Sequence, residues 1–98
     1  QVEAKATRGD TPLILAAARG SDAIVQALLQ RSAKINEQNQ DGDTALMTAS
    51  RAGNAAAVKA LLAGGASTAL RNNKRATAGD VARDRGFAEL ARAIEGKS

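Results

Sequence analysis

Apolar and polar residues alternate along this chain with the spacing of amphipathic helices, and the pattern comes in pairs of short segments. The first segment opens at Thr11, a good N-cap residue, and Pro12 follows at the first helical position, where its missing N–H costs nothing. The segment ends at Gly20, which accepts the left-handed conformation of a helix C-cap. We therefore predict a first helix from Pro12 to Arg19.

A second amphipathic segment follows at once. Ser21 is its expected cap, and the spacing predicts a helix from about Asp22 to Arg31. The apolar face of this helix consists of four residues at helical spacing: Ile24, Val25, Leu28 and Leu29. A polar connector, Asn36 to Asp43, then leads to the next pair and holds Asp41-Gly42, which is a turn signal.

The whole arrangement repeats with a fixed period, which is the interval from Thr11 to Thr44 and again from Thr44 to Thr77. Glycines and alanines recur in the same register: Gly20, Gly53 and Gly86; Ala16, Ala49 and Ala82. A fixed period of this length is typical of stacked solenoids, in which no unit buries its apolar face alone. We predict an all-α solenoid of stacked helix-turn-helix units with projecting turns, which offers a binding surface rather than a catalytic pocket.

The motifs within each unit resemble those of the ankyrin-repeat family. Thr11-Pro12-Leu13, followed by Ala16-Ala17 and Gly20, resembles the signature T-P-L-H-x-A with its following glycine. Leu28-Leu29 and Ala33-Lys34-Ile35-Asn36 resemble the end of such a unit. The resemblance covers almost the whole chain and implies one ankyrin-repeat domain over 1–98: the end of a preceding unit (1–5), two repeats (6–38 and 39–71) and a C-terminal capping repeat (72–98).

One signature residue is missing in every copy. Ile14, Met47 and Asp80 stand where the family has histidine, so the hydrogen bond that ties this imidazole to the threonine hydroxyl is expected to be absent. We interpret Met47 as a soft space-filling side chain.

The two ends of the predicted stack differ. The helices of the third copy carry charged residues, as a cap facing water should: Arg83, Asp84, Arg85, Glu89, Arg92 and Glu95. The first copy has Ile14 and Leu15 where the second has Met47 and Thr48, and Val2 falls one repeat period before Ile35. This end is predicted to be uncapped, so that either an upstream segment has been removed or something covers the apolar face.

Composition restricts the chemistry. The chain has 98 residues without a single cysteine or histidine, which excludes disulfides, thiolate nucleophiles and thiolate or imidazole metal sites. The segment Asn39 to Asp43 has too few carboxylates for a calcium loop. Asp80 and Asp84 lie among arginines and are interpreted as surface ion-pair partners. We expect no enzyme activity, no cofactor and no metal.

Charge is distributed unevenly, since residues 1–49 carry a net −1 and residues 50–98 a net +5. The C-terminal half is therefore the part that an acidic partner would feel. Phe87 is the only aromatic residue, so base-stacking platforms are missing and we do not expect nucleic-acid binding. No apolar run is long enough for a membrane span. The absence of cysteine favours a periplasmic or secreted protein over a cytoplasmic one, and leaves the compartment open.

The resemblance implies a binding surface made of turn tips and of the positions before each repeat glycine. Carried over by register, the turn tips are Thr7, Arg8 and Asp10; Gln40, Asp41 and Asp43; and Asn73, Lys74 and Ala76. The helix positions are Ala18 and Arg19, Arg51 and Ala52, and Asp84 and Arg85. Arg8-Gly9-Asp10 is also identical to the integrin-recognition tripeptide, but Gly42-Asp43-Thr44 in the next unit explains the same residues as a structural template.

These observations predict a non-enzymatic protein that binds another protein and is a monomer when free. The alanine and arginine bias is typical of bacteria, and we expect a small inhibitor or immunity-type protein that occludes a partner enzyme, for which a cell-wall hydrolase is one candidate. The alternative is a fragment of a larger ankyrin scaffold or adaptor without an inhibitory role. Asp41→Lys combined with Asp43→Lys is expected to weaken binding and to leave the fold intact.

Overall fold

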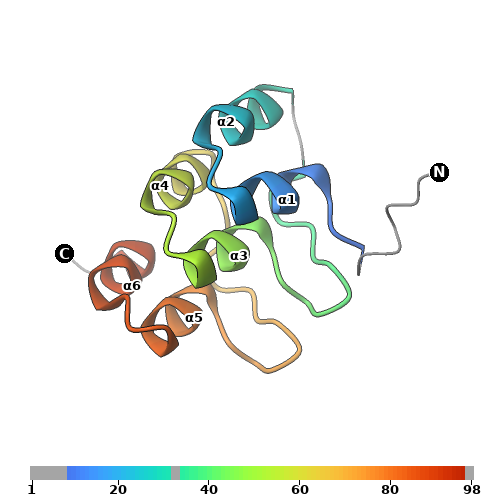
Figure 1. Cartoon of the computed structure of the whole chain (residues 1–98). Coiled ribbons are helices and arrows are strands. Elements are labelled where there is room, and N and C mark those ends of the chain that lie inside the picture. The colour runs from blue at the N-terminus through green and yellow to red at the C-terminus, as the bar shows by residue number, and fades with distance from the viewer. Residues whose placement is uncertain (1–8, 32–33, 97–98) are drawn as a thin grey trace.

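The computed structural model describes residues 9–31 and 34–96, and this part of the chain forms six helices in three antiparallel pairs (Figure 1). The helices are α1 (Pro12–Arg19), α2 (Asp22–Gln30), α3 (Ala45–Ala52), α4 (Ala55–Ala63), α5 (Ala78–Asp84) and α6 (Ala88–Glu95). In Figure 1, α1, α3 and α5 form an inner row, α2, α4 and α6 form an outer row, and long turns project beside the inner row. The all-α stack of helix pairs predicted from the sequence is confirmed.

Each inner helix begins in the same way. The hydroxyl of the capping threonine accepts a hydrogen bond from the backbone N–H three residues on: Ile14 to Thr11 at 3.1 Å, Met47 to Thr44 at 3.2 Å and Asp80 to Thr77 at 3.2 Å. α1 has the predicted bounds and ends at Gly20 with φ 72°. α2 ends at Gln30, one residue before the predicted end, and Arg31 serves as its C-cap.

The outer helices begin differently, and the prediction for Ser21 was wrong in its mechanism. Neither Ser21 nor its counterpart Asn54 makes a side-chain capping bond. The backbone N–H of Ser21 instead donates to the carbonyl of Ala16 at 3.2 Å, so the end of α1 positions the start of α2. The side chain of Asn54 bridges helix pairs, because its Nδ2 donates to the carbonyl of Ala17 at 3.0 Å.

The apolar core lies between the two rows. Met47 is 1% exposed within it, which confirms its role as a space-filling side chain. The position at which the family has histidine still makes a polar contact in two of the three copies, which was not predicted from the sequence. Met47 Sδ accepts the backbone N–H of Thr44 at 3.4 Å, and Asp80 Oδ2 accepts that of Thr77 at 3.1 Å. These bonds go to the threonine backbone rather than to its hydroxyl.

The two ends of the stack differ as expected. At the C-terminal end Arg83 pairs with Asp80 at 3.2 Å and also with Glu95, so Asp80 is a surface ion-pair partner as predicted. The same prediction for Asp84 was wrong, because no ion pair within residues 9–31 and 34–96 involves it. At the opposite end Ile14 is buried, whereas Leu15 is 42% and Ile24 is 53% exposed. Apolar residues dominate a hollow of about 300 Å³ on this N-terminal face, lined by Pro12, Leu15, Ala16, Arg19, Ile24 and Leu28. The predicted end of a preceding unit, residues 1–5, lies outside the described residues.

None of the described helices has the length and apolar character needed to cross a membrane.

Candidate functional site

The projecting turns are closed by asparagine side chains. Asn39 Oδ1 accepts the backbone N–H groups of Asp41 at 2.9 Å and of Asp43 at 3.0 Å. In the next turn Asn72 Oδ1 accepts those of Lys74 at 2.9 Å and of Ala76 at 3.0 Å. Asparagine favours such turns because its side-chain oxygen reaches backbone donors two to four residues on. The second and third turns are therefore each held in one conformation by their own sequence.

Neighbouring turns are also bonded to each other. Asn39 Nδ2 donates to Asp10 Oδ1 at 2.7 Å, and its counterpart Asn72 Nδ2 donates to Asp43 Oδ1 at 3.0 Å. Asn73 adds two bonds, from its backbone N–H to the Asp41 carbonyl at 2.9 Å and from its Nδ2 to the Gln40 carbonyl at 2.8 Å. The turns thus form a continuous ridge whose backbone is ordered before any partner arrives.

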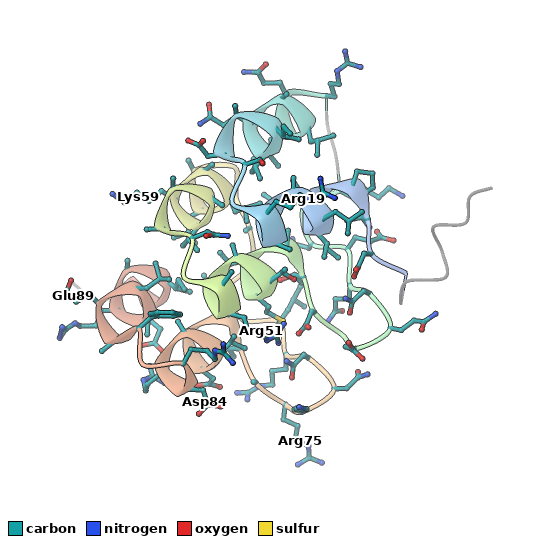
Figure 2. All side chains as sticks on the ribbon, viewed as in Figure 1. Arg19, Arg51, Lys59, Arg75, Asp84 and Glu89 are labelled. Carbon is teal, nitrogen blue, oxygen red and sulfur yellow. The ribbon has the colours of Figure 1, made fainter. Side chains whose placement is uncertain are left out.

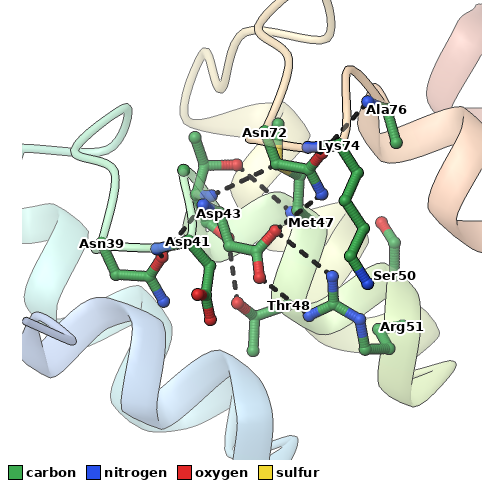
Figure 3. A network of polar contacts seen from close by, with 12 residues as sticks. Asn39, Asp41, Asp43, Met47, Thr48, Ser50, Arg51, Asn72, Lys74 and Ala76 are labelled. Carbon is green, nitrogen blue, oxygen red and sulfur yellow. Dashed lines mark hydrogen bonds and ion pairs between the residues drawn. The ribbon is translucent and has the colours of Figure 1, made fainter. Parts of the chain in front are cut away.

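Asp43 lies at the centre of this polar network, which Figure 3 shows from close by. Its carboxylate accepts hydrogen bonds from both terminal nitrogens of Arg51, at 3.0 and 3.2 Å, in addition to the one from Asn72. Asp43 is 5% exposed, so it is not the open turn tip that the sequence predicted. A lysine here would leave Arg51 and Asn72 without their acceptor and bury a second positive charge. We therefore now expect Asp43→Lys to destabilise the fold, in contrast to the expectation from the sequence.

A polar cleft of about 370 Å³ opens beside the network, between the second and third turns. Its lining combines predicted site residues with Asn72: Asp41, Asp43, Arg51, Asn72, Asn73 and Lys74. Arg51 rises into this cleft from the last turn of α3, and its side chain remains 41% exposed although it is bonded to Asp43. The cleft therefore offers unused guanidinium N–H donors to a partner.

The other predicted residues spread along the same side of the stack. Arg19 at the end of α1 and Arg85 after α5 are exposed, as are Gln40, Asn73 and Lys74. Figure 2 shows that Arg19, Arg51 and Arg75 lie beside the inner row, whereas Lys59 and Glu89 lie on the far side, beside the outer row. Thr7 and Arg8 lie outside the described residues.

The tripeptide that matches the integrin motif is part of the same turn ladder where it is described. Gly9 has φ 71°, and the Asp10 carboxylate is bonded to Asn39. Both features are those of the repeat template, which agrees with the structural interpretation of Gly9 and Asp10.

The sequence reasoning missed Asn39 and Asn72, the two residues that close the turns and join them. The signal was present, because the two asparagines stand one repeat period apart and thus in register. The first copy has Ala6 at this position, so the asparagine recurs in two of the three units only.

A family model for ankyrin repeats, in three copies, matches residues 1–93. The chain belongs to the ankyrin-repeat family. No curated protein matches it significantly. Ankyrin repeats are non-catalytic modules that bind other proteins, so this ankyrin domain is a protein–protein interaction module and not an enzyme.

Proposed function

We propose that this ankyrin protein is an inhibitor or immunity-type protein, which binds a partner enzyme by laying its ridge of turns across the active-site cleft. A cell-wall hydrolase is one candidate target. The observation that carries the proposal is the rigid ridge itself, in which Asn39, Asn72 and Asn73 hold neighbouring turns together. A projecting, ordered ridge is complementary in shape to a concave site, and enzyme active sites are concave.

Rigidity also favours tight binding. Ordering a flexible loop at an interface costs free energy, and turns that are already fixed by hydrogen bonds avoid most of that cost. The second and third turns present exposed polar groups above a bonded backbone, among them Gln40 and Asp41 in the second and Lys74 in the third.

The experiment is affinity capture with this chain as bait, followed by a titration of the captured enzyme's activity. We expect one enzyme to be recovered at one-to-one stoichiometry and its activity to fall as the chain saturates it. Gln40→Lys combined with Asp41→Lys should weaken affinity by about tenfold or more, because charge reversal at the centre of an interface costs roughly 1–3 kcal/mol. Asp43 is left unchanged, since it supports the turn.

The matched control is Gln26→Glu combined with Lys59→Glu, on exposed positions of α2 and α4 in the outer row. The control should bind like the parent chain. Equal losses in both variants would contradict binding through the ridge. A saturated enzyme that keeps its full activity, or capture of many unrelated proteins, would replace the inhibitor by the scaffold or adaptor alternative.

A further inference from the structure

The third turn contains an unusual backbone conformation. Gly9, Gly42 and Arg75 occupy equivalent positions in successive repeats and have φ angles of 71°, 80° and 67°. Arg75 is the one non-glycine residue with positive φ in the part of the chain that the structure describes. Because a Cβ is disfavoured in the left-handed region, glycine is the unstrained choice here and arginine is a strained one. Strain of this kind often accompanies a functional residue.

The arginine belongs to a concentrated positive charge. The turn around it also carries Arg71 and Lys74, and all three side chains are exposed. Arg71 Nη1 donates to the Arg75 carbonyl at 2.9 Å, which steadies the tip. Figure 2 shows the Arg75 side chain pointing away from the helices at the tip of the turn. Within 9–31 and 34–96, none of these three cations takes part in an ion pair.

The turn has also lost the acidic residue that its counterparts carry. Asp10 and Asp43 accept bonds from the asparagine of the following turn, and Ala76 stands at this position in the third copy. In the second turn Asp43 neutralises Arg51, whereas Ala76 offers no carboxylate to the cations of the third turn. Two departures from the repeat pattern, Gly to Arg and Asp to Ala, thus change the charge of this turn in the same direction.

We propose that the third turn, residues 71–76, is the docking element for an acidic segment of the partner protein, with Arg75 and Lys74 as the residues that select it. The proposal rests on the proposed function and names the chemistry of the partner. Arginine fits carboxylates because its planar guanidinium donates two parallel hydrogen bonds, and Lys74 adds a point charge at the edge of the cleft. A short turn with three cations matches a short acidic stretch. Phe87, the one aromatic residue of the chain, is the N-cap residue of α6 and does not belong to this turn.

The first test separates binding from folding through Arg75→Gly. This substitution removes the charge and restores the residue that suits the backbone. We expect the thermal midpoint to stay unchanged or to rise by about 4 °C, since relief of strain shifts a small domain by that order. A clear fall in the midpoint would show that Arg75 is a structural residue and would overturn the proposal.

The second test measures binding of a fluorescent oligoglutamate peptide by anisotropy at low ionic strength, where screening is weak. Lys74→Gln combined with Arg75→Gly should weaken binding about fivefold to tenfold, because the variant loses two exposed charge pairs with the peptide and each such pair is weak. The matched control, Lys59→Gln combined with Arg92→Gln, removes two exposed cations from α4 and α6 and should leave binding within about twofold.

Equal losses in the two variants would show attraction by net charge alone and would overturn the proposal. Tighter binding of a duplex oligonucleotide through the same two residues would overturn it in favour of a nucleic-acid site. The peptide measurement needs no captured enzyme, so it decides this proposal even if no enzyme is inhibited. Conversely, an enzyme that is inhibited equally by the Lys74 and Arg75 variant and by the parent leaves the proposed function standing and removes this inference.

Discussion

The first and second helix pairs have nearly the same apolar pattern but different surroundings. Leu61 in α4 is completely buried, whereas its counterpart Leu28 in α2 is only partly buried. Ala57 is also completely buried, and its counterpart Ile24 is 53% exposed. The cause is position, since a preceding pair covers α4 while no described residue covers the matching face of α2 (Figure 1). A repeat motif therefore specifies where a residue lies in its unit, and the neighbouring unit decides how deeply it is buried and how much it contributes to stability.

Leu61→Ala should give the largest effect in this comparison. It removes a fully buried side chain and leaves a cavity, so we expect the free energy of unfolding to fall by about 4 kcal/mol. Leu28→Ala should cost about half as much, because the parent side chain is already partly in water. Urea unfolding, monitored by circular dichroism, measures the loss in each variant. Equal losses would mean that the N-terminal face is covered in solution.

Gly42→Ala and Gly9→Ala compare the same backbone position in two turns. A Cβ on Gly42 would lie 2.8 Å from the backbone nitrogen of Asn73, whereas the nearest atom to a Cβ on Gly9 is Gln40 Cγ at 3.6 Å. Both alanines are strained at positive φ, but only Gly42→Ala also collides with backbone. We expect the free energy of unfolding to fall by about 3 kcal/mol in Gly42→Ala and by about 1 kcal/mol in Gly9→Ala. Equal midpoints in urea would contradict the close approach of the second and third turns.

Asp43→Ala and Asp10→Ala compare the two carboxylates that bond to asparagine. Asp43 is buried and also binds Arg51, whereas Asp10 is half-buried and, among the described residues, accepts a bond from Asn39 alone. Removing Asp43 should cost about 2 kcal/mol, a figure reduced because Arg51 is exposed enough to regain water, and removing Asp10 should cost under about 1 kcal/mol. Thermal unfolding at neutral pH distinguishes them. A larger loss of stability for Asp10→Ala than for Asp43→Ala would contradict this ranking of the two carboxylates.

The smallest expected effect is a dependence of stability on pH. It distinguishes Asp80 from Met47, two residues at equivalent positions that both accept a bond from the threonine backbone. The backbone N–H of Thr77, more than any other group, lowers the pKa of Asp80 below its ordinary value of 3.8. The folded chain therefore binds this proton less readily than the unfolded chain, so the stabilisation exists above about pH 3.8 and disappears as the pH falls through the folded pKa.

Asp80→Asn should abolish this contribution, which is at most a few tenths of a kcal/mol because the side chain is 45% exposed. The stability difference between the parent and the variant should be constant near neutral pH and shrink below about pH 4, as urea titrations at several pH values would show. Met47 is the counterpart of Asp80 and does not titrate. The stability difference between the parent and Met47→Leu should therefore not change with pH. A parallel pH profile for both variants would contradict the assignment to Asp80.

Local patterns in the sequence were enough to define the helices and their order. Thr11, Thr44 and Thr77 cap the inner helices through local bonds that span three residues, and Gly20 ends α1 through its own backbone freedom. Such interactions involve residues close in the chain, so their spacing is visible in the sequence. The predicted bounds of α1 and α2 accordingly agree with the structure to within one residue.

Packing between the units, in contrast, determined which of these residues meet water and which meet each other. Asp43 was predicted as an exposed contact residue, yet the side chains of Asn72 and Arg51 arrive from the next turn and from α3 and enclose it. Ile14 and Leu15 are adjacent and equally apolar, but one is buried and the other is 42% exposed, according to which side of α1 has a neighbour. Burial is a property of elements brought together by folding, and the charge and apolar character of a residue do not specify it alone.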